Sequence, residues 1–258
     1  MITEMVDIRT PDGICDCFVA TPHGRGIYPS VIIYMDAFGP RAYLYEMAKK
    51  IAHHGFLVLL PNLFYRMRRA PVVNAKFPIS EADMPTVRPQ LMSYFEKFKP
   101  EQTMEDTSVF LDFLAKQKHA LPGKIGITGY CLGGGLAIRA AAQFNEHIAC
   151  AASFHAGRLA TDTPDSPHHL LDKIKAELYI AHADNDSSMP PEQIELLHKA
   201  LEQTRLQTGL QYEAETYTGA THGFTMADLP AYEQKALERH WEKLFGLLER
   251  TLKTGPSR

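Results

Sequence analysis

The sequence reads Gly129-Tyr130-Cys131-Leu132-Gly133-Gly134-Gly135 between an apolar segment and an alanine-rich one. Residues 124–128 are partly β-branched, which favours a strand, and residues 136–144 consist mostly of helix-forming types. A turn that joins a strand directly to a helix is tight, and glycines beside its tip keep side chains away from the neighbouring backbone. The stretch therefore predicts that Cys131 is exposed at a strand-to-helix turn, in the position of a nucleophile.

The surroundings predicted for Cys131 suit nucleophilic chemistry. The positive N-terminal end of a helix stabilises a thiolate, and the backbone amide of Leu132 could serve as half of an oxyanion hole. The motif alone does not decide the matter, because a buried cysteine is most often an inert small hydrophobic residue. Catalysis and packing are equally open from these residues alone.

A candidate acid follows the next apolar strand. Residues 177–183 form that strand, and the loop after it contains Asp184 and Asp186 before Pro190. We favour Asp186, because it stands four residues before the proline, as the acid does in the usual pattern of hydrolases with this turn. Asp184 stays an alternative acid, and the structural alternative for Asp186 is a turn or helix-capping role.

A candidate base completes the set. His222 lies in a glycine-flanked loop, after strand-like alternation at 211–217 and before a long amphipathic helix expected at about 230–251. Such a loop is a suitable place for a mobile catalytic histidine, although a solvated loop histidine would look the same. The chain order of nucleophile, acid and histidine is the order that a doubly wound hydrolase sheet requires.

Through residues 129–134, the Asp186 loop and the sequence Gly219-Ala-Thr-His222-Gly-Phe224, the chain resembles the dienelactone hydrolase family of α/β-hydrolases. The resemblance covers nearly the whole chain and includes residues 31–39 and 55–66. It implies an α/β fold with a mostly parallel central sheet and helices on both faces. It also implies a carboxymethylenebutenolidase-like hydrolysis of small esters or lactones by a Cys131, His222 and Asp186 triad through a thioester acyl-enzyme.

The resemblance also assigns roles to the loop after the first central strand. Asp36 would lie close to the resting cysteine, and the amide of Ala37 would complete the oxyanion hole with Leu132. The usual family residue at position 36 is glutamate, so Asp36 reaches less far, and a turn-forming role is the alternative. Family members that hydrolyse dienelactone have an arginine where this chain has Met226. Whether dienelactone itself is a substrate is therefore left open.

A substrate carboxylate would need a different anchor in this chain. Arg66, Arg88 and Arg158 are candidates, because a guanidinium group can bind a carboxylate in two-pronged fashion, although a solvated surface charge is the default interpretation of each. Residues 65–100 depart from the alternation of strands and helices and are rich in proline, arginine and aromatic residues. We interpret them as a partial lid, with Tyr94, Phe95 and Phe98 as candidate pocket walls, or else as an irregular surface excursion.

Composition limits the other possibilities. The 258 residues are 45% hydrophobic and have no linker-like stretch, which predicts one domain spanning 1–258. The net charge of −3, without a basic stripe, argues against nucleic-acid binding. The N-terminus does not have the pattern of a secretory signal, and no apolar run approaches a membrane-spanning length. We expect a soluble cytoplasmic protein with a small-molecule ester or lactone substrate, and the oligomeric state is not predicted.

The remaining cysteines and histidines suggest structural roles. Cys15, Cys17 and Cys150 form no CxxC pair with one another or with Cys131, and the histidines show no metal-ligand spacing. We therefore expect free thiols and neither a metal nor a cofactor. Two other functional classes are possible on the same fold. One is a redox sensor in which Cys131 is reversibly oxidised, and the other is a non-catalytic binder of small carbonyl compounds.

Overall fold

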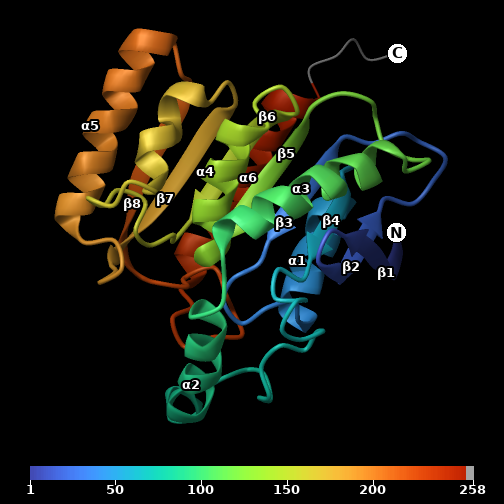
Figure 1. Cartoon of the computed structure of the whole chain (residues 1–258), viewed down its shortest axis with the longest axis horizontal. Coiled ribbons are helices and arrows are strands. Elements are labelled where there is room, and N and C mark those ends of the chain that lie inside the picture. Colours follow the sequence, from blue (N-terminus) through green and yellow to red (C-terminus); the bar gives the residue numbers. More distant parts are fainter. Residues whose placement is uncertain (254–258) are drawn as a thin grey trace.

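A computed structural model describes residues 1–253 of the chain (Figure 1). The strands are β1 (Ile2–Thr10), β2 (Gly13–Thr21), β3 (Ser30–Tyr34), β4 (Leu57–Pro61), β5 (Ile125–Tyr130), β6 (Ile148–Phe154), β7 (Glu177–Asn185) and β8 (Tyr212–Thr221). The α-helices are α1 (Ala42–His53), α2 (Met84–Phe95), α3 (Pro100–Ala115), α4 (Leu132–Gln143), α5 (Pro191–Thr208) and α6 (Gln234–Leu252). Two short 3₁₀ helices are η1 (Glu81–Asp83) and η2 (Pro167–Lys173).

All eight strands belong to one sheet, in the order β1-β2-β4-β3-β5-β6-β7-β8. The opening strands β1 and β2 are antiparallel, and β2 also pairs antiparallel with β4. From β4 to β8 every pairing is parallel. Every residue of β3, β4 and β5 is buried, which explains their continuous apolar runs, since central parallel strands are covered on both faces.

The neighbours of β5 residues show which helix covers each face of the sheet. Side chains alternate between the two faces along a strand, so Gly126 and Tyr130 share one face and Gly129 lies on the other. A methyl group placed at Gly126 would touch Leu248 of α6, and the Tyr130 hydroxyl lies 2.9 Å from Nε2 of His240, also in α6. A methyl group at Gly129 would instead strike the backbone of α4. Helices α6 and α4 therefore cover opposite faces, and the predicted mostly parallel sheet between two helical layers is confirmed.

The segment 65–100 contains more structure than the sequence indicated. It begins as an irregular loop and continues through η1 into α2, which projects beyond the sheet at the bottom of the view (Figure 1). Elsewhere the helices begin and end close to their predicted positions. Helix α4 covers 132–143, where a helix-forming run was noted at 136–144, and α6 covers 234–252 where about 230–251 was expected.

The parallel strands place the candidate residues at one edge of the sheet. Cys131 follows β5, and Asp186 and His222 each come directly after the ends of β7 and β8. Ala37 follows β3, which lies next to β5. Ligands of such sheets bind outside the carboxyl ends of the strands. The topology therefore brings these four residues to one edge of the sheet, although as many as 185 positions separate them in sequence. No helix within residues 1–253 is long and apolar enough to cross a membrane.

Candidate active site

The turn at Cys131 is strained in the way that its flanking glycines predict. Cys131 immediately precedes α4 with φ of 53° and ψ of −116°, a backbone conformation rarely adopted by residues other than glycine. A Cβ atom at Gly129 would lie 1.9 Å from the carbonyl oxygen of Gly133, and one at Gly133 would lie 2.3 Å from that of Tyr34. Only glycine at both positions lets β3, β5 and α4 approach closely enough to form this turn.

The Cys131 side chain opens into a cavity of about 620 Å³. The wall includes Ala37, Leu132, Asp186 and His222 together with Cys131. Leu132 is the first residue of α4, so its amide has no acceptor within the helix and is free to donate to a bound oxygen atom. The structure therefore brings all three candidate triad residues and both candidate oxyanion residues to one site.

The Asp186 carboxylate orients the His222 ring. Its Oδ2 atom lies 2.6 Å from Nδ1 of His222, and the Asp186 side chain is almost fully buried. This contact directs the opposite ring nitrogen, Nε2, away from the acid, as a base serving Cys131 requires. The alternative acid, Asp184, is exposed and accepts a hydrogen bond from the amide of Gly219. Of the two aspartates, only Asp186 contacts the histidine.

The charges of this cluster depend on one another. Burial alone would lower the pKa of His222, but the charge interaction with Cys131 and the hydrogen bonds to Asp186 and Cys131 outweigh it and raise the pKa to about 11. Burial would likewise raise the pKa of Asp186, but its hydrogen bond and ion pair with His222 hold it below the ordinary value. Each partner thus favours the charged form of the other.

Sequence reasoning missed Ser188, which supports the acid. Its hydroxyl donates to Oδ1 of Asp186 at 2.6 Å, and its amide donates to the same oxygen at 2.8 Å. The Ser188 oxygen also lies 3.2 Å from Nδ1 of His222. The spacing of an aspartate and a serine two residues later was a usable signal, because such pairs often close a turn through the aspartate oxygen.

Sequence reasoning also missed Arg41, which binds Asp36. The Arg41 guanidinium donates to Oδ1 and Oδ2 of Asp36 at 2.7 and 2.9 Å, and the amide of Phe38 donates to Oδ1 at 2.9 Å. The resemblance implied that Asp36 lies close to the resting cysteine. In this structure both oxygens of its carboxylate accept hydrogen bonds, and Arg41 also reaches Asp228 in the loop that follows His222.

His155 is a further residue that the sequence did not reveal. It is fully buried at the end of β6 with φ of 42°, and its Nε2 atom lies 2.7 Å from the Thr225 hydroxyl. Its ring meets that of His222 edge to face, with centroids 5.5 Å apart. Burial, together with the nearby His222 and His240 rings, lowers the pKa of His155 well below its usual value. A neutral ring therefore packs against the candidate base.

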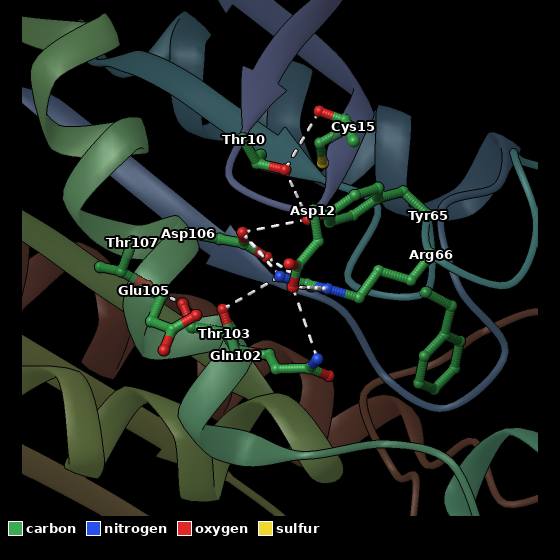
Figure 2. Close-up of polar contacts among 12 residues, drawn as sticks. Thr10, Asp12, Cys15, Tyr65, Arg66, Gln102, Thr103, Glu105, Asp106 and Thr107 are labelled. Atoms are coloured by element: carbon green, nitrogen blue, oxygen red, sulfur yellow. Dashed lines mark hydrogen bonds and ion pairs between the residues drawn. The ribbon is translucent and has the colours of Figure 1, made fainter.

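Of the four candidate substrate-binding residues, Arg158 alone lines the described part of the cavity wall. Arg88 is exposed, and the Tyr94 hydroxyl donates to the carbonyl oxygen of Val72 while its ring stacks on Phe64. Arg66 is bound elsewhere. Its Nη atoms hold both oxygens of Asp106 at 2.7 and 2.9 Å, and Nε donates to Asp12 at 2.8 Å (Figure 2).

The segment 65–100 forms part of the cavity wall through Met84, Leu91, Phe95 and Pro100. Of the aromatic residues proposed for this wall, Phe95 lines it. The other two candidates pack on Phe64: Phe98 meets its ring edge to face, and Tyr94 stacks on it. Another part of the wall is more polar and includes Arg139, Arg158, Thr161, Thr163, Asp165 and Ser166. The cavity thus has an apolar side beside α2 and a polar side beyond β6.

Other cysteines lie away from the cavity. Cys15, Cys17 and Cys150 are buried, and the Cys15 and Cys17 sulfurs are 3.5 Å apart on one face of β2. Burial raises the pKa of Cys150 to about 12. Among residues 1–253, no group of three or more histidine, cysteine, aspartate or glutamate side chains is arranged to hold a metal ion. Cys131 is half-buried and is the thiol that reaches the cavity wall.

Comparison with known proteins gives a consistent result. The model of the dienelactone hydrolase family matches residues 15–252. A protein of Synechocystis sp., provisionally named a carboxymethylenebutenolidase, is 24% identical over 243 residues, which are 92% of each chain. A Salmonella typhi protein with the same provisional name is 26% identical over 259 residues, covering 92% of this chain and 88% of its own.

Solved structures share the fold at lower sequence identity. A provisionally named dienelactone hydrolase of Klebsiella pneumoniae superposes with a TM-score of 0.81 at 20% identity, covering 96% of this chain and 98% of that one. The dienelactone hydrolase-like promiscuous phosphotriesterase P91, from metagenomic libraries, superposes with a TM-score of 0.73 at 18% identity, covering 97% and 98%. These likenesses confirm the predicted α/β-hydrolase fold.

Proposed function

Because the chain belongs to the dienelactone hydrolase family, we propose that it hydrolyses small esters or lactones with Cys131 as nucleophile. One observation carries the proposal. His222 is hydrogen-bonded to buried Asp186 at 2.6 Å and lines the same cavity as Cys131, which occupies a strained strand-to-helix turn. A nucleophile, a base and a group that orients the base are the three elements that covalent acyl transfer requires.

The proposed reaction has two steps. In the first, His222 takes the proton of the Cys131 thiol, the sulfur forms a bond to the carbonyl carbon, and the resulting oxyanion accepts hydrogen bonds from the amides of Ala37 and Leu132. The carbon–oxygen bond then breaks, His222 protonates the leaving alkoxide, and a thioester remains. In the second, His222 takes a proton from water as the water oxygen attacks the thioester carbon. The carbon–sulfur bond then breaks, and His222 returns the proton to sulfur, which releases the acid and the free thiol. Asp186 stabilises the imidazolium form of His222 throughout.

The cavity favours small activated substrates. Its volume of about 620 Å³ falls within the usual range of small-molecule sites, and the side beside α2 is apolar. Little free energy is released when a simple alkyl ester is converted to a thioester. Aryl, enol or cyclic esters, which have better leaving groups, are therefore the expected class of substrate. Met226 is fully buried, and it stands where the family resemblance implies an arginine in members that hydrolyse dienelactone. We therefore propose ester or lactone hydrolysis without assigning dienelactone as the substrate.

The test is hydrolysis of a short 4-nitrophenyl ester by the wild type and by Cys131→Ala, with lactones and a dienelactone assayed in parallel. Mass spectrometry of the wild type, quenched during turnover, should show Cys131 carrying the acyl group. Loss of at least about a thousand-fold in kcat/KM in the variant, together with that adduct, supports the proposal. Turnover that survives the substitution contradicts it. A reversible sulfenic acid on Cys131 without ester turnover would indicate the redox-sensing alternative.

A further inference from the structure

The Arg41 guanidinium is the centre of a buried polar cluster next to the cavity. Arg41 lies at the start of α1, with its side chain 4% exposed. All five of its N–H groups can be assigned. Nε donates to Asp228 Oδ2, Nη1 to Asp36 Oδ1 and the Gly39 carbonyl, and Nη2 to Asp36 Oδ2 and Asp228 Oδ1, over 2.7 to 3.1 Å. An arginine has no further donor to offer.

These bonds determine the conformation of the loop that contains Ala37. Arg41 holds the loop at both ends, at the Asp36 carboxylate and at the Gly39 carbonyl. The Asp36 carboxylate in turn accepts from the amide of Phe38, and the amide of Gly39 donates to the Asp36 carbonyl. Ala37 lies inside this closed set of bonds, so the direction of its amide depends on the Arg41 contacts.

The Arg41 guanidinium also binds Asp228, which lies in the loop after His222. Asp228 receives two of the guanidinium bonds, and its carbonyl accepts from the amide of Ile79 in the segment beside the cavity. This histidine loop, residues 222–233, also has ties of its own. The Tyr43 hydroxyl donates to the Thr225 carbonyl at 2.9 Å, and the Thr225 hydroxyl contacts His155. The histidine loop is therefore supported independently, whereas the Ala37 loop depends on Arg41.

Aromatic rings enclose the cluster. The Arg41 guanidinium lies 5.6 Å from the Phe38 ring centroid and 5.1 Å from that of Phe77, within the range of cation–π attraction. Burial alone would lower the pKa of Arg41, but Asp36 and Asp228 outweigh it, and the pKa is raised. The group is thus permanently charged, and its bonds form in a region with little competing water, where charged hydrogen bonds are strongest.

We propose that Arg41 is a positioning residue, which holds the Ala37 amide in the orientation that receives the oxyanion and uses the histidine loop as its anchor. The inference rests on the proposed function, because it assigns Arg41 to the same acyl-transfer site. It also changes the role of Asp36 from an acid near the thiol to a structural partner of Arg41. Arg41 itself is not among the residues that line the described cavity, so it acts through the loop.

Two reagents separate the proposed effect from general damage to the site. Iodoacetamide alkylates Cys131 as the sulfur displaces iodide, a reaction that develops no oxyanion. A trifluoromethyl ketone instead forms a reversible thiohemiketal, in which the sulfur bonds to the carbonyl carbon and the oxygen becomes an oxyanion. The ketone therefore reports on the Ala37 amide, and neither reagent requires ester turnover. The two measurements remain informative even if the wild type hydrolyses none of the esters tested.

The variant to test is Arg41→Lys, because an ammonium group keeps the charge but cannot bind two carboxylates in two-pronged fashion. We expect ketone affinity, and kcat for any ester that the wild type hydrolyses, to fall at least about ten-fold, while the alkylation rate stays within about three-fold. Arg66→Lys is the matched control. It disrupts a similar two-pronged pairing, with Asp106, away from the cavity, and should leave both ketone affinity and alkylation unchanged (Figure 2).

Asp228→Asn provides a second variant in case Arg41→Lys does not fold, as judged by near-UV circular dichroism. It leaves the Arg41 bonds to Asp36 in place and should give a smaller loss of ketone affinity, again with alkylation preserved. The proposal is overturned if a folded Arg41→Lys binds the ketone as tightly as the wild type. It is equally overturned if Arg66→Lys loses as much ketone affinity, or if alkylation falls in parallel with ketone affinity.

Discussion

The Nδ1 atom of His222 lies 2.6 Å from Oδ2 of Asp186, although 35 residues separate them and they follow different strands. The parallel pairing of β7 with β8 creates this contact, because it places the carboxyl ends of the two strands side by side. The hydroxyl and the amide of Ser188 hold the other carboxylate oxygen. The histidine ring is therefore oriented by a carboxylate that is itself fixed.

The two aspartates of the acid loop should differ sharply in their effect on catalysis. Asp186→Asn should lower kcat by about a thousand-fold or more, because the amide no longer stabilises the His222 imidazolium or selects its tautomer. Asp184→Asn is the matched control, since Asp184 is exposed and contacts the Gly219 amide. Steady-state kinetics on one activated ester checks both variants. Equal losses in the two would contradict the assignment of the acid.

The protonation of His222 should depend on Cys131. Replacing the thiol in Cys131→Ser removes the interactions with sulfur that help to raise the His222 pKa to about 11, so the pKa should fall towards the ordinary histidine value. NMR titration of the ring protons measures this directly. A raised pKa contributes stability that is fully present below about pH 6.5 and is lost as the pH rises through the folded value. An unchanged titration in the variant would show that the thiolate does not act on His222.

The glycines of the nucleophile turn should show different tolerance to alanine. Gly133→Ala places a Cβ atom 2.3 Å from the Tyr34 carbonyl oxygen, and should destabilise the fold by about 3 kcal/mol or more because the backbone cannot give way. Gly135→Ala meets its nearest atom, on Leu159, at 3.8 Å, and should stabilise α4 by up to about 1 kcal/mol. Urea unfolding measures both changes. A tolerated Gly133→Ala would mean that the turn is less tight than described.

Arg158 should affect the choice of substrate. It is exposed at the polar side of the cavity, and its amide donates to the Ser188 carbonyl at 2.8 Å, which holds it beside the acid loop. Arg158→Met should lower kcat/KM for an aryl ester with a carboxylate on its acyl chain by about ten-fold, while leaving the neutral analogue unchanged. Arg88→Met, outside the described wall, is the control. Equal rates for both esters in Arg158→Met would rule out an anchoring role.

The segment 65–100 should contribute to substrate binding through its apolar side chains, as a partial lid would. Phe95 lines the cavity, so Phe95→Ala should raise KM about ten-fold for a phenylacyl ester and much less for an acetyl ester. Phe98→Leu is the comparison, because Phe98 packs on Phe64 and should leave this selectivity unchanged. If Phe95→Ala has the wild-type KM for both esters, the segment does not contact substrate.

Local patterns were sufficient to predict much of this protein. The apolar runs, the glycines around Cys131 and the order of Cys131, Asp186 and His222 predicted the sheet, the turn and the candidate triad. These features are readable because each depends on neighbours close in sequence: a strand needs an apolar run, and a tight turn needs glycine. The resemblance to the dienelactone hydrolase family rested on the same short segments, and the family model matches residues 15–252.

Only the tertiary structure decided which charged side chains meet. Arg41 and Asp228 stand 187 positions apart, and no spacing or composition linked them, yet both oxygens of Asp228 bind the same guanidinium. Arg66 and Arg158 look alike in sequence, but one is bound by Asp106 and the other lines the cavity. Charged residues carry no periodic signal that names their partners, because a long side chain pairs with whichever opposite charge the fold brings within reach.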